Sequence, residues 1–158
     1  MQVGRLDIQI QGANAWFSGR LDEAANGFPE QVAAALPAGD TQIDLAGVAF
    51  VNSIGLRDWV QLIRYLRQRG TVTLWRIPER LMAQMNLLPE LHGATYIGSF
   101  HAPYICPSCG AEAEPLIDAI ANGPWLRQMQ APRVPCSECG SAMELAEFPE
   151  RYLSVLGR

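Results

Sequence analysis

The most informative segment of this chain is Gln42-Ile-Asp-Leu-Ala-Gly-Val-Ala-Phe-Val-Asn-Ser-Ile-Gly-Leu56. It begins as a largely apolar run, which is typical of a strand, and it reaches Asn52 and Ser53, two of the residue types that best cap a helix N-terminus. Apolar side chains then recur at helical spacing, at Leu56, Trp59, Val60, Ile63 and Leu66. The segment therefore predicts a strand that leads through a short loop into an amphipathic helix over residues 53–69, which Gly70 ends.

Strand-like and helix-like patterns alternate on both sides of this segment. The expected elements are a hairpin over residues 5–17, a helix within 22–36 that Gly27-Phe28-Pro29 starts or restarts, a strand over 71–75, a helix from Pro78 to Pro89 with Leu81, Met82, Met85 and Leu88 on its buried side, and a strand over 93–100. Such an alternation predicts an α/β fold, with helices packed against a mixed β-sheet whose helix-connected strands run mostly parallel.

The composition changes after Phe100. All four cysteines lie beyond this residue, and six of the eleven prolines fall within the next 35 residues. We therefore predict two domains, an α/β domain over residues 1–100 and a small appendage over residues 101–158. Within the appendage, we expect a short helix over 116–129 that Gly123-Pro124 breaks, and a strand followed by a final helical turn over 143–156.

The four cysteines form two similar units, Cys106-Pro-Ser-Cys109-Gly and Cys136-Ser-Glu-Cys139-Gly, with 26 residues between Cys109 and Cys136. Two CxxCG units predict one tetrahedral site of four thiolates, and zinc is the metal that such sites most often hold. The segment resembles the zinc knuckles of ribbon proteins, so we expect one structural Zn²⁺ bound by Cys106, Cys109, Cys136 and Cys139. A rubredoxin-like iron site is an alternative, and a thioredoxin-like dithiol is a weaker one.

Charge and composition exclude several classes of protein. The 158 residues carry 12 basic and 16 acidic side chains, with a net charge of −4, and acidic residues outnumber arginines seven to four beyond residue 100. This balance disfavours a protein that grips nucleic acid over a wide surface. No apolar run is long enough to span a membrane and the start of the chain lacks the pattern of a signal peptide, so we expect a cytoplasmic protein.

The sequence contains no recognisable catalytic arrangement. His92 and His101 have no acidic residue nearby at a useful spacing, and there is no Ser-His-Asp order, Gly-rich phosphate loop or HExxH helix. We therefore expect a protein that is not an enzyme.

The segment over residues 42–56 resembles the STAS domain, which sulphate transporters and anti-sigma factor antagonists share. In that family a DLSGVxFxDSSGL string runs from a central strand into the principal helix. The resemblance extends back to Ser18-Gly19-Arg20-Leu21-Asp22, which is similar to the family's GELD turn, and forward to about residue 98. It implies a STAS-like mixed sheet for the first two thirds of the chain, followed by the zinc-ribbon extension.

The resemblance also implies a function in bacterial regulation. STAS antagonists bind an anti-sigma factor that is also a serine kinase, and phosphorylation of one serine at the start of the principal helix breaks this contact. That serine aligns with Ser53, whereas the family's preceding Asp is Asn52 here and its second Ser is Ile54. A helix N-terminus presents unpaired N–H groups, so it can accommodate a phosphate.

The partner-docking residues expected from this resemblance are Val48, Asn52, Ser53, Gly55 and Arg57. A purely structural role is the alternative at several positions: Asn52 or Ser53 as a helix cap, Gly55 as a site of close packing, and Trp59 as a core residue rather than an exposed anchor. The second candidate function for the whole chain is a nucleic-acid-binding accessory protein in which the zinc ribbon makes the contact.

Overall fold

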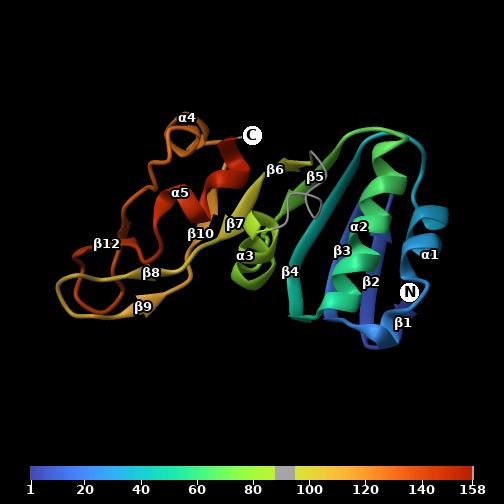
Figure 1. Ribbon diagram of the computed structural model, residues 1–158, viewed down its shortest axis with the longest axis horizontal. Coiled ribbons are helices and arrows are strands. Elements are labelled where there is room, and N and C mark those ends of the chain that lie inside the picture. Colours follow the sequence, from blue (N-terminus) through green and yellow to red (C-terminus); the bar gives the residue numbers. More distant parts are fainter. Residues whose placement is uncertain (88–94, 158) are drawn as a thin grey trace.

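The computed structural model describes residues 1–87 and 95–157 and has an α/β fold (Figure 1). Its main sheet has six strands in sequence order: β1 (Gln2–Val3), β2 (Leu6–Gln11), β3 (Asn14–Leu21), β4 (Thr41–Val51), β5 (Val72–Trp75) and β6 (Tyr96–Ile97). The pairs β1–β2 and β2–β3 are antiparallel, and the pairs from β3 to β6 are parallel. The predicted mixed sheet and its parallel, helix-connected strands are confirmed.

Helices cover one face of this sheet, and α1 (Phe28–Ala35) lies beside α2 (Ser53–Arg67) (Figure 1). The predicted helix over 22–36 is divided into a 3-10 helix, η1 (Glu23–Ala25), and α1, which begins after Gly27 with Pro29 in its first turn. Trp59 of α2 is fully buried and meets Phe17 of β3 edge to face, with ring centroids 5.8 Å apart. The prediction that Trp59 belongs to the core is confirmed.

The helix α2 ends at Arg67, so the prediction that Gly70 terminates it is wrong. Gly70 does not have the positive φ of a helix-terminating glycine. A Cβ atom at this position would lie 2.4 Å from the carbonyl carbon of Gly39. This glycine therefore allows two connecting segments to pack closely.

The helix predicted from Pro78 is α3 (Glu79–Leu87), and its residues Leu81, Met82 and Met85 are buried as expected. The predicted contributions of Leu88 and Pro89 lie outside the described residues.

The single strand predicted over 93–100 is wrong, because the described part of this range is divided at Gly98 between two sheets. Tyr96–Ile97 form β6 of the main sheet, whereas β7 (Ser99–His101) pairs with β10 (Leu116–Asp118). A Cβ at position 98 would lie 2.5 Å from the ring of Trp75, so only glycine fits where the chain leaves the main sheet. The predicted domain boundary at residue 100 falls inside β7.

The C-terminal part of the chain, residues 101–157, contains a four-stranded sheet with the order β11-β12-β8-β9. Its strands are β8 (Tyr104–Ile105), β9 (Glu112–Ala113), β11 (Val134–Pro135) and β12 (Ala142–Leu145). The helix expected over 116–129 is wrong before residue 123, where Leu116–Asp118 form β10 and a turn follows. Gly123-Pro124 begins α4 (Gly123–Arg127) rather than breaking it, since proline is well tolerated in a first turn.

The chain ends with α5 (Pro149–Tyr152) and the 3-10 helix η3 (Ser154–Gly157), as the pattern over 143–156 predicted. Both pack against α3. The amide of Asn86 in α3 donates to the carbonyl of Tyr152, and its oxygen accepts from the Ser154 hydroxyl at 3.2 Å. The C-terminal part is therefore held at the α3 side of the sheet, away from the N-terminus of α2 (Figure 1).

Over residues 1–87 and 95–157, no helix combines the length and the apolar character that crossing a membrane requires.

Candidate functional site

Ser53 is the first residue of α2 and is exposed to solvent. Asn52, the preceding residue, caps the helix: its side-chain oxygen accepts a hydrogen bond from the N–H of Gly55 at 2.9 Å. Because Asn52 fulfils the capping role, the hydroxyl of Ser53 is not needed for it. The structure thus places the predicted phosphoacceptor candidate at an accessible helix N-terminus.

The first turn of α2 is seated closely on the end of β3. The N–H of Asn52 donates to the carbonyl of Leu21 at 3.1 Å, and a Cβ at Gly55 would lie only 1.9 Å from the same carbonyl oxygen. Close packing, the structural alternative for Gly55, is therefore its role in the structure. This contact fixes the position of Ser53 relative to the sheet.

The turn that follows Leu21 is held by a buried carboxylate. Asp22 caps η1 by accepting from the N–H of Ala24, and it pairs with Arg20 at 3.0 Å and with Arg5 at 3.2 Å. Desolvation would raise the pKa of Asp22, but the hydrogen bond from Arg20 and the other favourable contacts lower it below its ordinary value. The segment resembling the GELD turn therefore stabilises the surface on which α2 begins.

The predicted docking residues do not all reach the surface. Ser53 and Arg57 are exposed and Asn52 is half-buried, but Val48 and Gly55 are buried. The prediction that Val48 and Gly55 form part of the docking surface is therefore corrected: Val48 faces the core, and the lack of a side chain at Gly55 serves the packing on Leu21.

Two further residues beside Ser53 were missed by the sequence analysis. Ile54 is 41% exposed, and Glu23 accepts a hydrogen bond from the Asn52 amide at 2.7 Å. Hydrogen bonds from the backbone N–H of Glu23 and from the Asn52 amide lower the pKa of the Glu23 carboxyl group. The departure of Ile54 from the family string was a usable signal, whereas Glu23 is 29 residues from Asn52 and no local pattern connects them. Asn52, Ser53, Ile54 and Arg57 are hereafter called the α2 surface.

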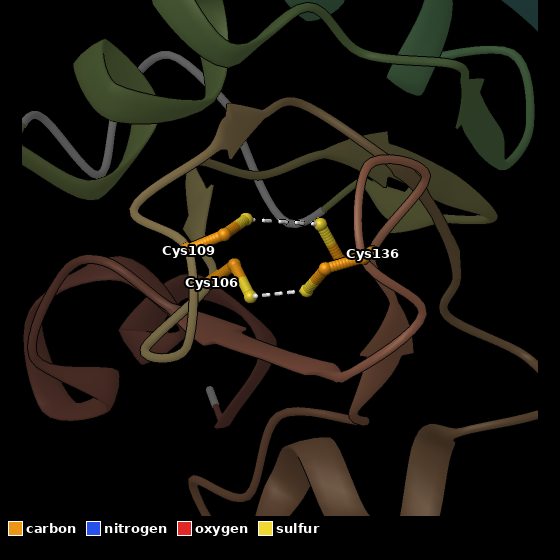
Figure 2. A group of neighbouring side chains, drawn as sticks. Cys106, Cys109 and Cys136 are labelled. Carbon is orange, nitrogen blue, oxygen red and sulfur yellow. Dashed lines mark hydrogen bonds between the residues drawn. The ribbon is translucent and has the colours of Figure 1, made fainter.

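The four cysteines form the second candidate site, and their side chains converge from two hairpins (Figure 2). All four Sγ atoms lie within 4.8 Å of one another. The distance between Cys106 Sγ and Cys139 Sγ is 3.5 Å, and that between Cys109 Sγ and Cys136 Sγ is 3.7 Å. These distances are too long for disulfide bonds, and all four cysteines are free.

The two cysteine turns have the same local conformation. In the first, the N–H of Gly110 donates to the carbonyl of Cys106 at 2.8 Å; in the second, the N–H of Gly140 donates to that of Cys136 at 2.9 Å. The two glycines have φ values of 78° and 77°, which a residue with a side chain rarely adopts. The trailing glycine of each CxxCG unit is therefore required by the turn.

This arrangement fits a tetrahedral metal ion. With metal–sulfur bonds of about 2.3 Å, tetrahedral geometry requires Sγ–Sγ separations of about 3.8 Å, close to the two distances above. Cys106 and Cys136 are buried, and Cys109 and Cys139 are exposed, so one side of the site faces solvent. The cluster is thus compatible with one bound metal ion.

Cys109 and Cys139 differ in how readily their thiols lose a proton. A backbone hydrogen bond from Ala111 favours the Cys109 thiolate, but desolvation and the three neighbouring thiols outweigh it and raise the pKa of Cys109 to about 12. Hydrogen bonds from the side chain and backbone of Ser141 lower the pKa of Cys139 to about 6. A metal ion that binds all four sulfurs therefore displaces protons as it binds.

Comparison with known proteins gave no match to the chain, either among family models or among curated proteins.

Proposed function

We propose that this protein is a non-enzymatic regulatory module with a STAS-like domain, acting as an anti-sigma factor antagonist or a related partner-switching adaptor in bacteria. Its partner is an anti-sigma factor with serine kinase activity or a related regulator. The observation that carries the proposal is the exposure of Ser53 at the N-terminus of α2, beside a helix cap that Asn52 already provides.

The α2 surface has the features that a switchable contact needs. Ile54 offers an exposed apolar side chain and Arg57 an exposed charge, and arginine is one of the residue types that often contribute most of the binding energy of an interface. A phosphate on Ser53 would add a charge of about −1.5 to −2 at this position. The helix N-terminus tolerates that charge, so modification would disturb the contact while leaving the fold intact.

We expect Ser53→Asp to weaken binding to the cognate anti-sigma kinase about tenfold or more, because a negative charge then lies within the contact. Ser53→Ala should bind like the wild type and should not accept phosphate. Binding is measured by calorimetry with candidate kinases encoded near this gene, and phosphate transfer by mass spectrometry of the intact chain.

Two arginines of α2 provide the matched control for this experiment. Arg57→Ala should weaken the same interaction, whereas Arg67→Ala, at the opposite end of the helix and also exposed, should not. Equal binding by Ser53→Asp, Ser53→Ala and the wild type would refute the switch. Equal binding by both arginine variants and the wild type would place the contact elsewhere.

We further propose that the metal ion of the cysteine cluster is one structural Zn²⁺. Zinc favours four thiolates in a tetrahedron, and the C-terminal part has only a small core of its own for the metal to supplement. The ion would link the hairpin β8–β9 to the hairpin β11–β12, which the β8–β12 pairing joins into one sheet. In this proposal the metal maintains the fold and takes no part in chemistry.

Elemental analysis of the purified protein is expected to find about one zinc per chain, as a four-thiolate site implies, and the protein should be colourless. If the purified protein contains less than one zinc per chain, it is reconstituted with Zn²⁺ under reducing conditions and measured again. A red protein that contains iron would instead identify a rubredoxin-like centre and refute the zinc assignment.

The acidic character of residues 101–158 argues against the nucleic-acid-binding alternative. These residues include seven acidic side chains and only four arginines. One of the arginines, Arg133, forms an ion pair with Glu144, with 3.9 Å between a guanidinium nitrogen and a carboxylate oxygen. Salt-sensitive retardation of DNA or RNA by this protein would favour that alternative over the proposed function.

A further inference from the structure

The face of the main sheet opposite α1 and α2 carries an unusual set of aromatic side chains. Side chains alternate between the two faces of a strand. Ala15, Ile43 and Leu74 are buried on the helix-covered face, so the residues that follow them, Trp16, Asp44 and Trp75, point to the open face. The strand register places Trp16, Asp44 and Trp75 in one row across β3, β4 and β5. Trp16 does not belong to the helix-covered core, and its side chain is 39% exposed.

A second row lies beside the first on the same face. The register aligns Asn14, Gln42 and Thr73 across the same strands, and Tyr96 of β6 follows Thr73. Tyr96 is 63% exposed. The open face thus combines three aromatic rings with amide, hydroxyl and carboxylate groups.

A hollow of about 290 Å³ lies between the two tryptophans, and its lining residues are Asn14, Ala15, Trp16, Gln42, Asp44 and Trp75. Trp75 is held in place, because its indole N–H donates to the side-chain oxygen of Gln42 at 2.6 Å and its ring packs against Gly98. A ring fixed in this way loses little conformational freedom when a ligand stacks on it.

The charge within the hollow is compensated. Arg76 Nε lies 2.7 Å from one carboxylate oxygen of Asp44, and the N–H of Ala46 donates to the other at 3.0 Å. This pairing removes the attraction that Asp44 would otherwise exert on a cationic ligand, and the net charge of −4 disfavours a polyanion. The hollow therefore suits a neutral ligand.

The polar groups around the hollow suit hydroxyl groups in particular. Each hydroxyl both donates and accepts, and the Asp44–Arg76 pair presents acceptor and donor atoms side by side. Gln42 uses its oxygen for Trp75, which leaves its NH₂ group as a donor for a ligand. A ring with an apolar C–H face and a hydroxyl edge would match both the tryptophans and these groups.

We propose that this open face is a binding site for a neutral carbohydrate, in which one pyranose ring stacks on Trp16 beside Trp75 and its hydroxyls bind Asp44, Arg76 and Gln42. Tyr96 extends the aromatic surface toward a neighbouring sugar unit. The site is on the opposite face of the sheet from α2, so it goes beyond the proposed partner switch and does not depend on it.

The test titrates the full, metal-loaded chain with three soluble hexasaccharides, of β-1,4-linked glucose, α-1,4-linked glucose and β-1,4-linked N-acetylglucosamine. Saturable binding of at least one is expected, measured by calorimetry and by tryptophan fluorescence. Trp16→Ala should weaken that binding about tenfold, as the loss of a stacking ring implies. The matched control is Trp125→Ala, which removes an exposed tryptophan from α4 and should leave binding unchanged.

Two further probes test the ligand class, a tetra-arginine peptide and a single-stranded oligothymidine. Trp16-dependent binding of either probe, with none of the three sugars, would overturn the carbohydrate assignment. Absence of binding to all three hexasaccharides at millimolar concentration would also overturn it, and so would equal loss of binding in Trp16→Ala and Trp125→Ala. Thermal denaturation of both variants verifies that each is folded.

Discussion

Replacement of Cys106 by Ser is expected to abolish tight metal binding and to unfold the C-terminal hairpins. Cys106 is almost fully buried and supplies one of the four clustered thiols directly after β8. Structural zinc sites contribute about 10 kcal/mol or more of binding free energy, which becomes folding free energy when the site forms only in the folded state. Metal content after gel filtration and limited proteolysis within residues 101–158 measure the two effects.

Ser108→Ala is the control for this variant, because Ser108 lies in the same turn, is exposed and is not a ligand. It should retain the metal and resist protease like the wild type. If Cys106→Ser kept one tightly bound metal ion per chain and an intact C-terminal part, the proposed structural role of the metal would be wrong. The main sheet should retain its cooperative unfolding transition in both variants, since its core is built largely from residues before β7.

Trp59→Ala is expected to destabilise the protein by about 4 kcal/mol, the usual cost of truncating a large aromatic side chain in a core. Trp59 lies between α2 and the sheet and contacts the ring of Phe17, which in turn meets Phe28 of α1 at 6.2 Å. Its removal would therefore loosen both helices that cover the sheet. Urea denaturation followed by far-UV circular dichroism gives the change in the free energy of unfolding.

Trp125→Ala serves as the comparison, because Trp125 is 59% exposed and its loss should change the free energy of unfolding by less than about 0.5 kcal/mol. Should Trp59→Ala be too unstable to purify, Trp59→Phe should show a smaller loss in the same assay. Similar stabilities for Trp59→Ala and Trp125→Ala would contradict the packing described for α2.

Local patterns were sufficient where a structure depends on neighbours in the chain. The junction from β4 into α2 followed from the apolar run, the Asn52-Ser53 pair and helical spacing, and Asn52 is indeed the cap. The two CxxCG units likewise predicted a cluster of four thiols, because each turn positions its own two sulfurs and the glycine conformation is local.

Predictions failed where a residue's role depends on a distant segment. The sequence predicts Gly98 as an ordinary strand residue. In the structure the chain changes sheets at Gly98, where the ring of Trp75 leaves no room for a side chain. The resemblance predicts Val48 at the docking surface, whereas the structure places it in β4 with its side chain buried in the core. Gly70 resembled a helix terminator, but its contact is with Gly39, 31 residues earlier.

The order of strands and helices from β2 to α3, the amphipathic face of α2 and the set of four thiols are therefore written in the sequence, because each depends on spacing along a few turns or one strand. Tertiary packing alone brought Glu23 to Asn52, aligned Trp16, Asp44 and Trp75 across three strands, and held the C-terminal part on α3 so that Ser53 stays exposed. These features arise from sheet register and from contacts between segments far apart in the chain, which no short-range pattern encodes.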